Sequence, residues 1–126
     1  MFSTRIATQI YAKICFETTL GQKKIIEKLS EYLAGDDFSR IFVLNGYAGT
    51  GKTTLIAALV GALKDLNIKP ILLAPTGRAA KVLAQYAQEK AFTIHKRIYR
   101  QRTNADYESK YSLNFNAEKG AVFIVD

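Results

Sequence analysis

Apolar side chains recur at helical spacing in the first part of the chain. Ile6, Ile10 and Ile14 stand four residues apart within residues 3–16, which is the spacing of one face of an α-helix. A second apolar face follows in residues 25–33, with charged residues between its members, and the pattern stops at the Gly-Asp-Asp sequence of residues 35–37. Because glycine is common just after the last turn of a helix, the pattern predicts two amphipathic helices before residue 38.

Three short apolar runs follow, at residues 41–44 (I-F-V-L), 71–74 (I-L-L-A) and 121–125 (A-V-F-I-V). Such runs are typical of strands covered on both faces. Helical patterns occupy residues 52–66 and the stretch that begins at residue 77, whereas residues 103–120 are polar and predict a loop with a short hairpin. Alternation of strands and helices predicts an α/β fold with a parallel sheet and right-handed crossovers.

The turn between the first strand and the next helix is rich in glycine. Residues 46–53 read G-Y-A-G-T-G-K-T and satisfy the pattern G-x-x-x-x-G-K-[ST]. Glycines let successive backbone N–H groups point inward, and a helix N-terminus adds partial positive charge, so this combination binds phosphates. The alternative is a plain glycine-rich turn. The predicted nucleotide-binding residues are Gly46, Tyr47, Ala48, Gly49, Thr50, Gly51, Lys52, Thr53 and Thr54.

Two residues of this pattern are candidates for direct chemistry. Lys52 would reach the β- and γ-phosphate oxygens, and the Thr53 hydroxyl would ligate Mg²⁺. A later apolar strand supplies an aspartate to the metal in enzymes of this kind, and the run F-I-V-D ends at Asp126. We therefore predict that Lys52 and Asp126 are catalytic and that Thr53 and Asp126 bind Mg²⁺. We also expect the chain to be the first part of a longer protein.

The positive charge is concentrated in one region. The net charge is +7, and residues 78–102 hold seven Lys or Arg side chains against one acidic side chain, Glu89. Such a cluster is the usual electrostatic signature of a polyanionic partner. A solvated basic face is the alternative.

Nothing in the sequence predicts a membrane or an oxidising compartment. The longest apolar run, residues 55–63, is too short to span a bilayer, and Arg5, Gln9 and Lys13 interrupt the apolar residues of the N-terminus. The single cysteine, Cys15, fits a reducing compartment and a packing role. These features predict a cytoplasmic protein with no membrane partner.

Four further stretches stand around residues 46–53 in a fixed order. They are T-L-G-Q at residues 19–22, A-P-T-G-R-A-A-K-V-L at residues 74–83, T-I-H-K-R-I-Y-R at residues 93–100, and F-I-V-D at the end. As a set they resemble the glutamine motif, motifs Ia and Ib and the start of motif II of RecD-like, 5′-to-3′ DNA helicases of superfamily 1. The resemblance covers residues 19–126.

The resemblance implies roles for individual residues. Gln22 would contact the adenine edge and favour ATP, although a surface glutamine on a helix is the alternative. A single strand of DNA, or of RNA, would be contacted by Thr76, Arg78, Thr93, His95, Lys96 and Arg97. Arg78 could instead solvate its helix, and His95 could be a core or capping group. The aromatic residues Phe92 and Tyr99 would offer stacking surfaces or serve as packing.

The resemblance also implies the fold and the domain organisation. We expect a P-loop NTPase of RecA-like α/β fold, with a parallel sheet and flanking helices, incomplete at the C-terminus. Residues 1–126 would be the N-terminal part of helicase domain 1A. Residues 1–37 would form the helices with the glutamine motif, and residues 38–126 the P-loop core through Asp126. Its partners would be the rest of the first domain and a second RecA-like domain.

Such a piece is expected to bind nucleotide weakly, to lack appreciable turnover and to self-associate through unpaired strand edges. The parent protein would be an ATP-dependent DNA helicase. Two other classes remain open. A non-motor, regulatory nucleotide-binding module explains residues 46–53 and Asp126 equally well, and a nucleotide or small-molecule kinase would have no affinity for single strands.

Overall fold

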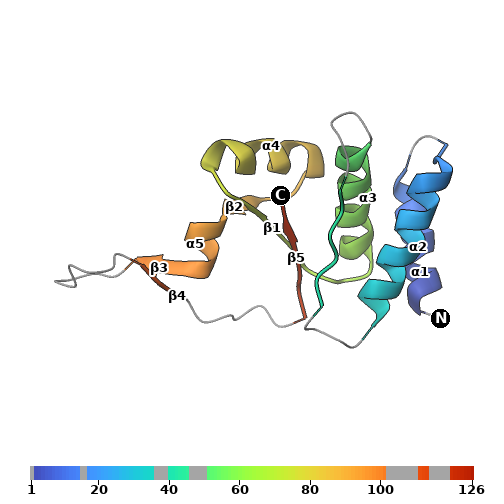
Figure 1. Ribbon diagram of the computed structural model, residues 1–126, viewed down its shortest axis with the longest axis horizontal. Coiled ribbons are helices and arrows are strands. Elements are labelled where there is room, and N and C mark those ends of the chain that lie inside the picture. The colour runs from blue at the N-terminus through green and yellow to red at the C-terminus, as the bar shows by residue number, and fades with distance from the viewer. Residues whose placement is uncertain (1, 15–16, 36–39, 46–50, 102–110, 114–119) are drawn as a thin grey trace. The chain divides into compact units, whose positions relative to one another are not determined.

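The computed structural model describes residues 2–14, 17–35, 40–45, 51–101, 111–113 and 120–126 (Figure 1). The chain divides into two compact units, Met1–Asn67 and Ile68–Asp126. We describe each unit by itself. The division predicted from the sequence, into helices of residues 1–37 and a core of residues 38–126, stays a prediction.

Helices form most of the described part of the first unit. Its helices are α1 (Phe2–Lys13), α2 (Leu20–Ala34) and α3 (Lys52–Asp65), and α1 packs against both of the others (Figure 1). Ile6 and Ile10 of α1 and Ile26 of α2 are fully buried, as the helical spacing predicts. The two amphipathic helices are therefore confirmed, although α1 ends at Lys13 and leaves Ile14 outside the helix. Cys15 lies outside the described residues.

A close contact joins the end of α1 to the middle of α3. The stem of Lys13 crosses Gly61, where an added Cβ would lie 3.3 Å from the Lys13 Cδ atom. Its ammonium group forms an ion pair with the Asp65 carboxylate at 2.7 Å. Gly61 therefore leaves room for an aliphatic stem whose charged end is held one turn further along α3.

The prediction of a strand at residues 41–44 is wrong. Residues 40–45 have no strand assignment, and Ile41 and Val43 are 85% and 71% exposed. Phe42 and Leu44 are half-buried. An apolar run becomes a strand only when another chain segment supplies hydrogen-bond partners for its backbone, and residues 40–45 pair with no strand among the described residues.

The second unit contains a three-stranded parallel sheet. Its strands are β1 (Pro70–Ala74), β2 (Ala91–Thr93) and β5 (Val122–Val125), in the order β2-β1-β5. Leu72 of β1 lies opposite Ala91 on one side and Ile124 on the other. The central position of β1 explains its continuous apolar sequence, since residues 71–74 are all at most 3% exposed.

Helix α4 (Gly77–Ala87) follows β1 and packs against β1 and β2 (Figure 1). Its apolar side includes Leu83, which is 1% exposed. The predicted α/β class, with a parallel sheet and flanking helix, is thus confirmed. Strand β2 was not predicted, because its three residues give no periodicity that the sequence could show.

A short helix and a hairpin follow β2. Helix α5 (Ile94–Ile98) leads into β3 (Tyr99–Gln101), which pairs antiparallel with β4 (Tyr111–Leu113). The predicted hairpin is present, but its first strand lies before residue 103. None of the helices in the described ranges is both long enough and apolar enough to cross a membrane.

Candidate functional site

The start of α3 has the backbone geometry expected of a phosphate-binding turn. Gly51 precedes the helix with φ 85° and ψ 12°, in the left-handed region that favours glycine. The first N–H groups of an α-helix have no partner within the helix, and Gly51 has no side chain with which to cap them. These donors and the helix dipole make the start of α3 suitable for an anion.

Only part of the predicted nucleotide-binding motif lies within the described residues. Lys52 is half-buried, and Thr53 and Thr54 are exposed in the first turn of α3. Gly46, Tyr47, Ala48, Gly49 and Thr50 lie outside the described residues. The structure therefore describes the helical half of the motif.

Gln22 lies at the start of α2 and contacts the start of α3. The Gln22 side-chain Oε1 atom accepts a hydrogen bond from the Thr19 backbone N–H at 2.9 Å. The Gln22 backbone N–H donates to the Thr19 hydroxyl at 3.2 Å. These two bonds form a capping box. A Cβ added to Gly51 would lie 2.7 Å from the Gln22 Nε2 atom, so the carboxamide of Gln22 rests beside the backbone of the phosphate-binding turn.

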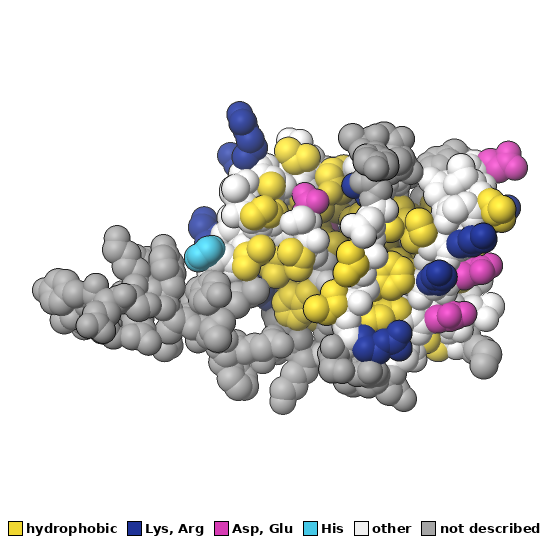
Figure 2. Space-filling view, viewed as in Figure 1, with side chains coloured by type: hydrophobic (Ala, Val, Ile, Leu, Met, Phe, Trp, Pro, Cys, Tyr) yellow, Lys and Arg dark blue, Asp and Glu magenta, His cyan; other side chains and the backbone are white. Residues whose placement is uncertain are grey.

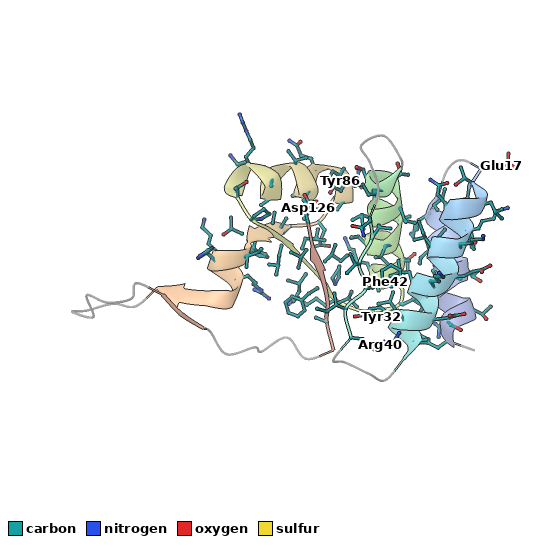
Figure 3. All side chains as sticks on the ribbon, viewed as in Figure 1. Glu17, Tyr32, Arg40, Phe42, Tyr86 and Asp126 are labelled. Carbon is teal, nitrogen blue, oxygen red and sulfur yellow. The ribbon has the colours of Figure 1, made fainter. Side chains whose placement is uncertain are left out.

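Asp126 extends from the end of β5. Its backbone N–H donates to the Leu73 carbonyl at 2.9 Å, which continues the pairing of β5 with β1. The residue is exposed. Tyr86 of α4 lies near it (Figure 3). Partial burial raises the pKa of the Tyr86 phenol above its usual value, and the negative charge of Asp126 raises that pKa further.

The two predicted metal ligands belong to different units, Thr53 to the first and Asp126 to the second. Both are exposed. Hydroxyl and carboxylate oxygens are hard ligands of the kind that Mg²⁺ takes in nucleotide sites. Each of the two side chains, taken by itself, is therefore chemically suited to Mg²⁺.

Thr76 and Arg78 stand at the start of α4, as the sequence predicted. The Thr76 hydroxyl accepts a hydrogen bond from the Ala79 N–H at 3.1 Å and caps the helix. Arg78 is exposed in the first turn. Figure 2 shows basic side chains standing out from the surface over α4 and beside α5, which gives the second unit a positively charged face.

The second group of predicted nucleic-acid contacts surrounds α5. Thr93 ends β2, and its hydroxyl accepts from the Lys96 N–H at 3.2 Å. His95 and Lys96 are exposed, and Arg97 is half-buried. The Thr93 hydroxyl therefore already has a structural bond at the start of α5.

Two cationic side chains lie over the ring of Phe92. The Lys90 ammonium and the Arg97 guanidinium each lie 5.2 Å from the centre of its ring, within the range of a cation–π interaction. The Phe92 ring therefore interacts with two cations, Lys90 and Arg97. The sequence had suggested only base stacking or packing for this residue. The side chains of Tyr99 and Arg100, and all of Arg102, lie outside the described part of the chain.

Sequence reasoning missed two residues that shape these sites. Thr19 orients Gln22, and the capping-box pattern T-x-x-Q of residues 19–22 could have revealed it. Lys90 contributes the second cation at Phe92. Lys90 directly precedes β2 and stands two residues before Phe92, a spacing that in extended backbone puts both side chains on one side, but only the structure shows the contact.

Comparison with known proteins supports the reading of the motifs. Residues 19–126 match a family model described as an AAA domain. A stretch of 57 residues is 39% identical to an ATP-dependent RecD2 DNA helicase of Deinococcus radiodurans and covers 45% of this chain and 8% of that protein. Another match, 45% identical over 53 residues, is to the ATP-dependent DNA helicase dda of Enterobacteria phage T4 and covers 41% of this chain and 12% of that protein.

These matches confirm the resemblance to ATP-dependent DNA helicases. The resemblance is limited to a short part of each relative, because the matched segments span about a tenth of the length of these curated proteins.

Proposed function

The chain belongs to the AAA domain family, and on that premise we propose that it is the ATP-binding portion of a helicase that moves along single-stranded DNA. The observation that carries the proposal is the start of α3. A left-handed Gly51 within the glycine-rich motif opens a helix without a side-chain cap, and the carboxamide of Gln22 rests beside it. A helix end suited to an anion and a carboxamide are thus adjacent in one unit.

Each residue has a defined task in binding ATP. The N–H groups at the start of α3 bind phosphate oxygens, and Lys52 balances the charge of the β- and γ-phosphates. Gln22 contacts the adenine edge, for which a carboxamide offers both a donor and an acceptor. Thr53 of the first unit and Asp126 of the second are each proposed as a Mg²⁺ ligand, and the ion would neutralise phosphate charge.

The nucleic acid is proposed to lie along the charged face of the second unit. Thr76 and Arg78 at the start of α4 contact phosphates of the strand, whereas Thr93 and His95 contact its backbone or a base. Lys96 and Arg97 add positive charge along the backbone. The two relatives are named as DNA helicases, which favours DNA over RNA. We propose that the chain is part of a longer helicase, since the relatives that it matches are much longer. A cytoplasmic location is proposed from the sequence features given above.

We also propose that the chain by itself binds ATP weakly and without appreciable turnover. We also expect self-association, because Phe123 and Val125 of β5 are 40% and 60% exposed beside a strand edge that no described strand covers. Light scattering, which measures the molecular mass in solution, tests the expected self-association.

Titration with a fluorescent ATP analogue in the presence of Mg²⁺ tests the nucleotide site. Lys52→Ala should abolish or strongly weaken binding without lowering the melting temperature, whereas Lys28→Ala, an exposed control on α2, should leave binding unchanged. Equal affinities for the wild type and Lys52→Ala would refute the site. Steady-state hydrolysis that depends on Lys52 would refute the expected lack of turnover.

The competing function is a non-motor, regulatory nucleotide-binding module. It requires the same nucleotide site but no affinity for single strands. Binding of a labelled oligodeoxynucleotide that weakens steeply with salt supports the helicase portion, and saturable ATP binding without any such affinity supports the regulatory module.

A further inference from the structure

Two like charges are gathered around the ring of Phe92. The Lys90 ammonium and the Arg97 guanidinium each lie 5.2 Å from the ring centre, although Lys90 directly precedes β2 and Arg97 belongs to α5. Two cations repel each other when they are brought together, and the face of an aromatic ring offsets part of that repulsion. An arrangement that gathers positive charge in this way is suited to an anionic ligand.

The ring determines where the charge of Lys90 lies. Two residues along a strand span about 6–7 Å, and Lys90 stands two residues before Phe92. The contact with the ring therefore draws the Lys90 ammonium along β2, toward the end at which Thr93 leads into α5. The residues proposed to contact the single strand around α5 begin at that end.

The Lys90 ammonium is accessible to a ligand. Lys90 is exposed, and its side chain forms no salt bridge within the described part of the chain. Glu89 is the one acidic side chain of residues 78–102, and it accepts a hydrogen bond from the Lys90 backbone N–H at 3.4 Å. An ammonium group has three N–H donors, so it can bind a phosphate oxygen on the side that faces away from the ring.

The same contacts argue against a nucleobase on Phe92. A base stacks on the face of an aromatic ring, which is also the part that attracts cations. A base and the two cations would therefore compete for one half-buried ring. A phosphate does not compete in this way, because it binds the cations and not the ring.

We propose that Lys90 contacts a phosphate of the bound single strand and that Phe92 is a positioning residue, which holds Lys90 and Arg97 by cation–π contacts and stacks on no base. The inference rests on the proposed function, since it requires a single strand along the second unit. It adds one contact to that site, and it makes binding at Phe92 independent of the bases of the strand.

Three substitutions separate contact from positioning. Lys90→Met removes the charge and keeps an aliphatic stem. Phe92→Leu removes the aromatic face and keeps an apolar side chain, whereas Phe92→Tyr keeps the ring. Lys28→Met is the control, because it removes an exposed cation from α2 in the other unit.

The experiment measures dissociation constants of the full chain for two labelled probes over a range of salt concentrations. One probe is an oligodeoxythymidylate, and the other is an abasic oligonucleotide of the same length, which has the phosphates without the bases. Lys90→Met should reduce the slope of log K against log salt by about 0.7, as expected for one phosphate contact with a single strand. Lys28→Met should leave the slope unchanged.

Loss of the Phe92 ring should weaken binding without changing the number of phosphate contacts. In Phe92→Leu both cations remain, but they must be ordered when the strand binds. We therefore expect about twofold to fivefold weaker binding with the wild-type salt slope. The loss should be equal for the two probes, and Phe92→Tyr should bind both probes as the wild type does.

Three results would overturn the inference. A wild-type salt slope in Lys90→Met would show that Lys90 contacts no phosphate. A loss in Phe92→Leu that is confined to the oligodeoxythymidylate would show that Phe92 stacks on a base, and no loss with either probe would show that it positions nothing. If circular dichroism shows that Phe92→Leu does not fold, Phe92→Met replaces it with the same expected results, because methionine adapts to irregular gaps.

The failure of this inference is distinguishable from failure of the proposed function. If the wild type binds neither probe, no single strand lies along the second unit, and the proposed helicase function fails. If both probes bind and Arg78→Ala weakens that binding, but Lys90→Met and Phe92→Leu behave as the wild type does, only the roles of Lys90 and Phe92 are overturned.

Discussion

The rings of Tyr32 and Phe42 lie 5.6 Å apart at an angle of 51°, and the Tyr32 hydroxyl donates to the Arg40 carbonyl at 2.7 Å (Figure 3). Tyr32 is in the last turn of α2, whereas Gln22 in the first turn of the same helix rests beside Gly51. Helix α2 therefore contacts the chain before the glycine-rich motif, at Arg40 and Phe42, and within the motif, at Gly51.

Removing the Tyr32 hydroxyl should weaken this contact without removing the ring. We expect Tyr32→Phe to lower the free energy of unfolding by about 0.5–1 kcal/mol, which is the usual net value of a neutral hydrogen bond. Urea denaturation measures the change. Tyr11→Phe is the control, because no hydrogen bond of the Tyr11 hydroxyl is present in the described residues, and equal losses in the two variants would contradict the assignment.

The two glycines of the α3 region should respond differently to alanine. Gly51→Ala places a side chain in the left-handed region, at a cost of about 1–2 kcal/mol, and drives a methyl group into the Gln22 carboxamide. We expect lower stability and weaker ATP binding.

Gly61→Ala is the matched control for that substitution. It adds a methyl group inside the helix, where alanine is favoured by about 1 kcal/mol, against a flexible lysine stem that can shift. The expected change is neutral or stabilising, measured by thermal melting. Similar destabilisation at both positions would show that backbone conformation is not the reason for Gly51.

The ion pair between Lys13 and Asp65 should contribute little to stability. The two side chains are 38% and 46% exposed, and exposed pairs of this kind contribute about 0.2–1 kcal/mol. Lys13→Met keeps an aliphatic stem over Gly61 and removes the charge. Its small destabilisation should disappear at 1 M salt, where charges are screened. A loss that persists at high salt would assign the contribution to packing of the stem.

Thr76 has two candidate roles, which two substitutions separate. Thr76→Val removes the cap of α4 and should cost about 1 kcal/mol. Thr76→Asp keeps a capping oxygen and should preserve stability, but its negative charge should repel a phosphate at the same helix end. Melting temperature and single-strand affinity are measured together. If Thr76→Asp binds the oligonucleotide as the wild type does, no phosphate lies at the start of α4.

Arg78 should contribute to the salt dependence of single-strand binding. Replacing one phosphate-contacting cation with alanine reduces the slope of log K against log salt by about 0.7 for a single strand. We expect that reduction for Arg78→Ala, and none for Lys28→Ala, which removes an exposed cation in the other unit. Identical slopes for Arg78→Ala and the wild type would show that Arg78 contacts no phosphate. Its role would then be the alternative one, an exposed charge that solvates α4.

The sequence by itself determined helices α1 to α4 and strands β1 and β5. The spacing of Ile6 and Ile10 predicted the buried side of α1, and the apolar run of residues 71–74 predicted β1, because each pattern repeats with the period of its own local structure. It also predicted a phosphate-binding motif, since that chemistry depends on consecutive backbone N–H groups and therefore on residues adjacent in the chain.

Tertiary structure decided which apolar runs pair and which side chains meet. Residues 41–44 are as apolar as β1 but pair with no described strand, whereas the short β2 completes the sheet, because strand formation depends on a partner distant in sequence. The approach of Gln22 to Gly51, and of Lys90 and Arg97 to Phe92, likewise follows from how elements pack. Local periodicity contains no information about such contacts.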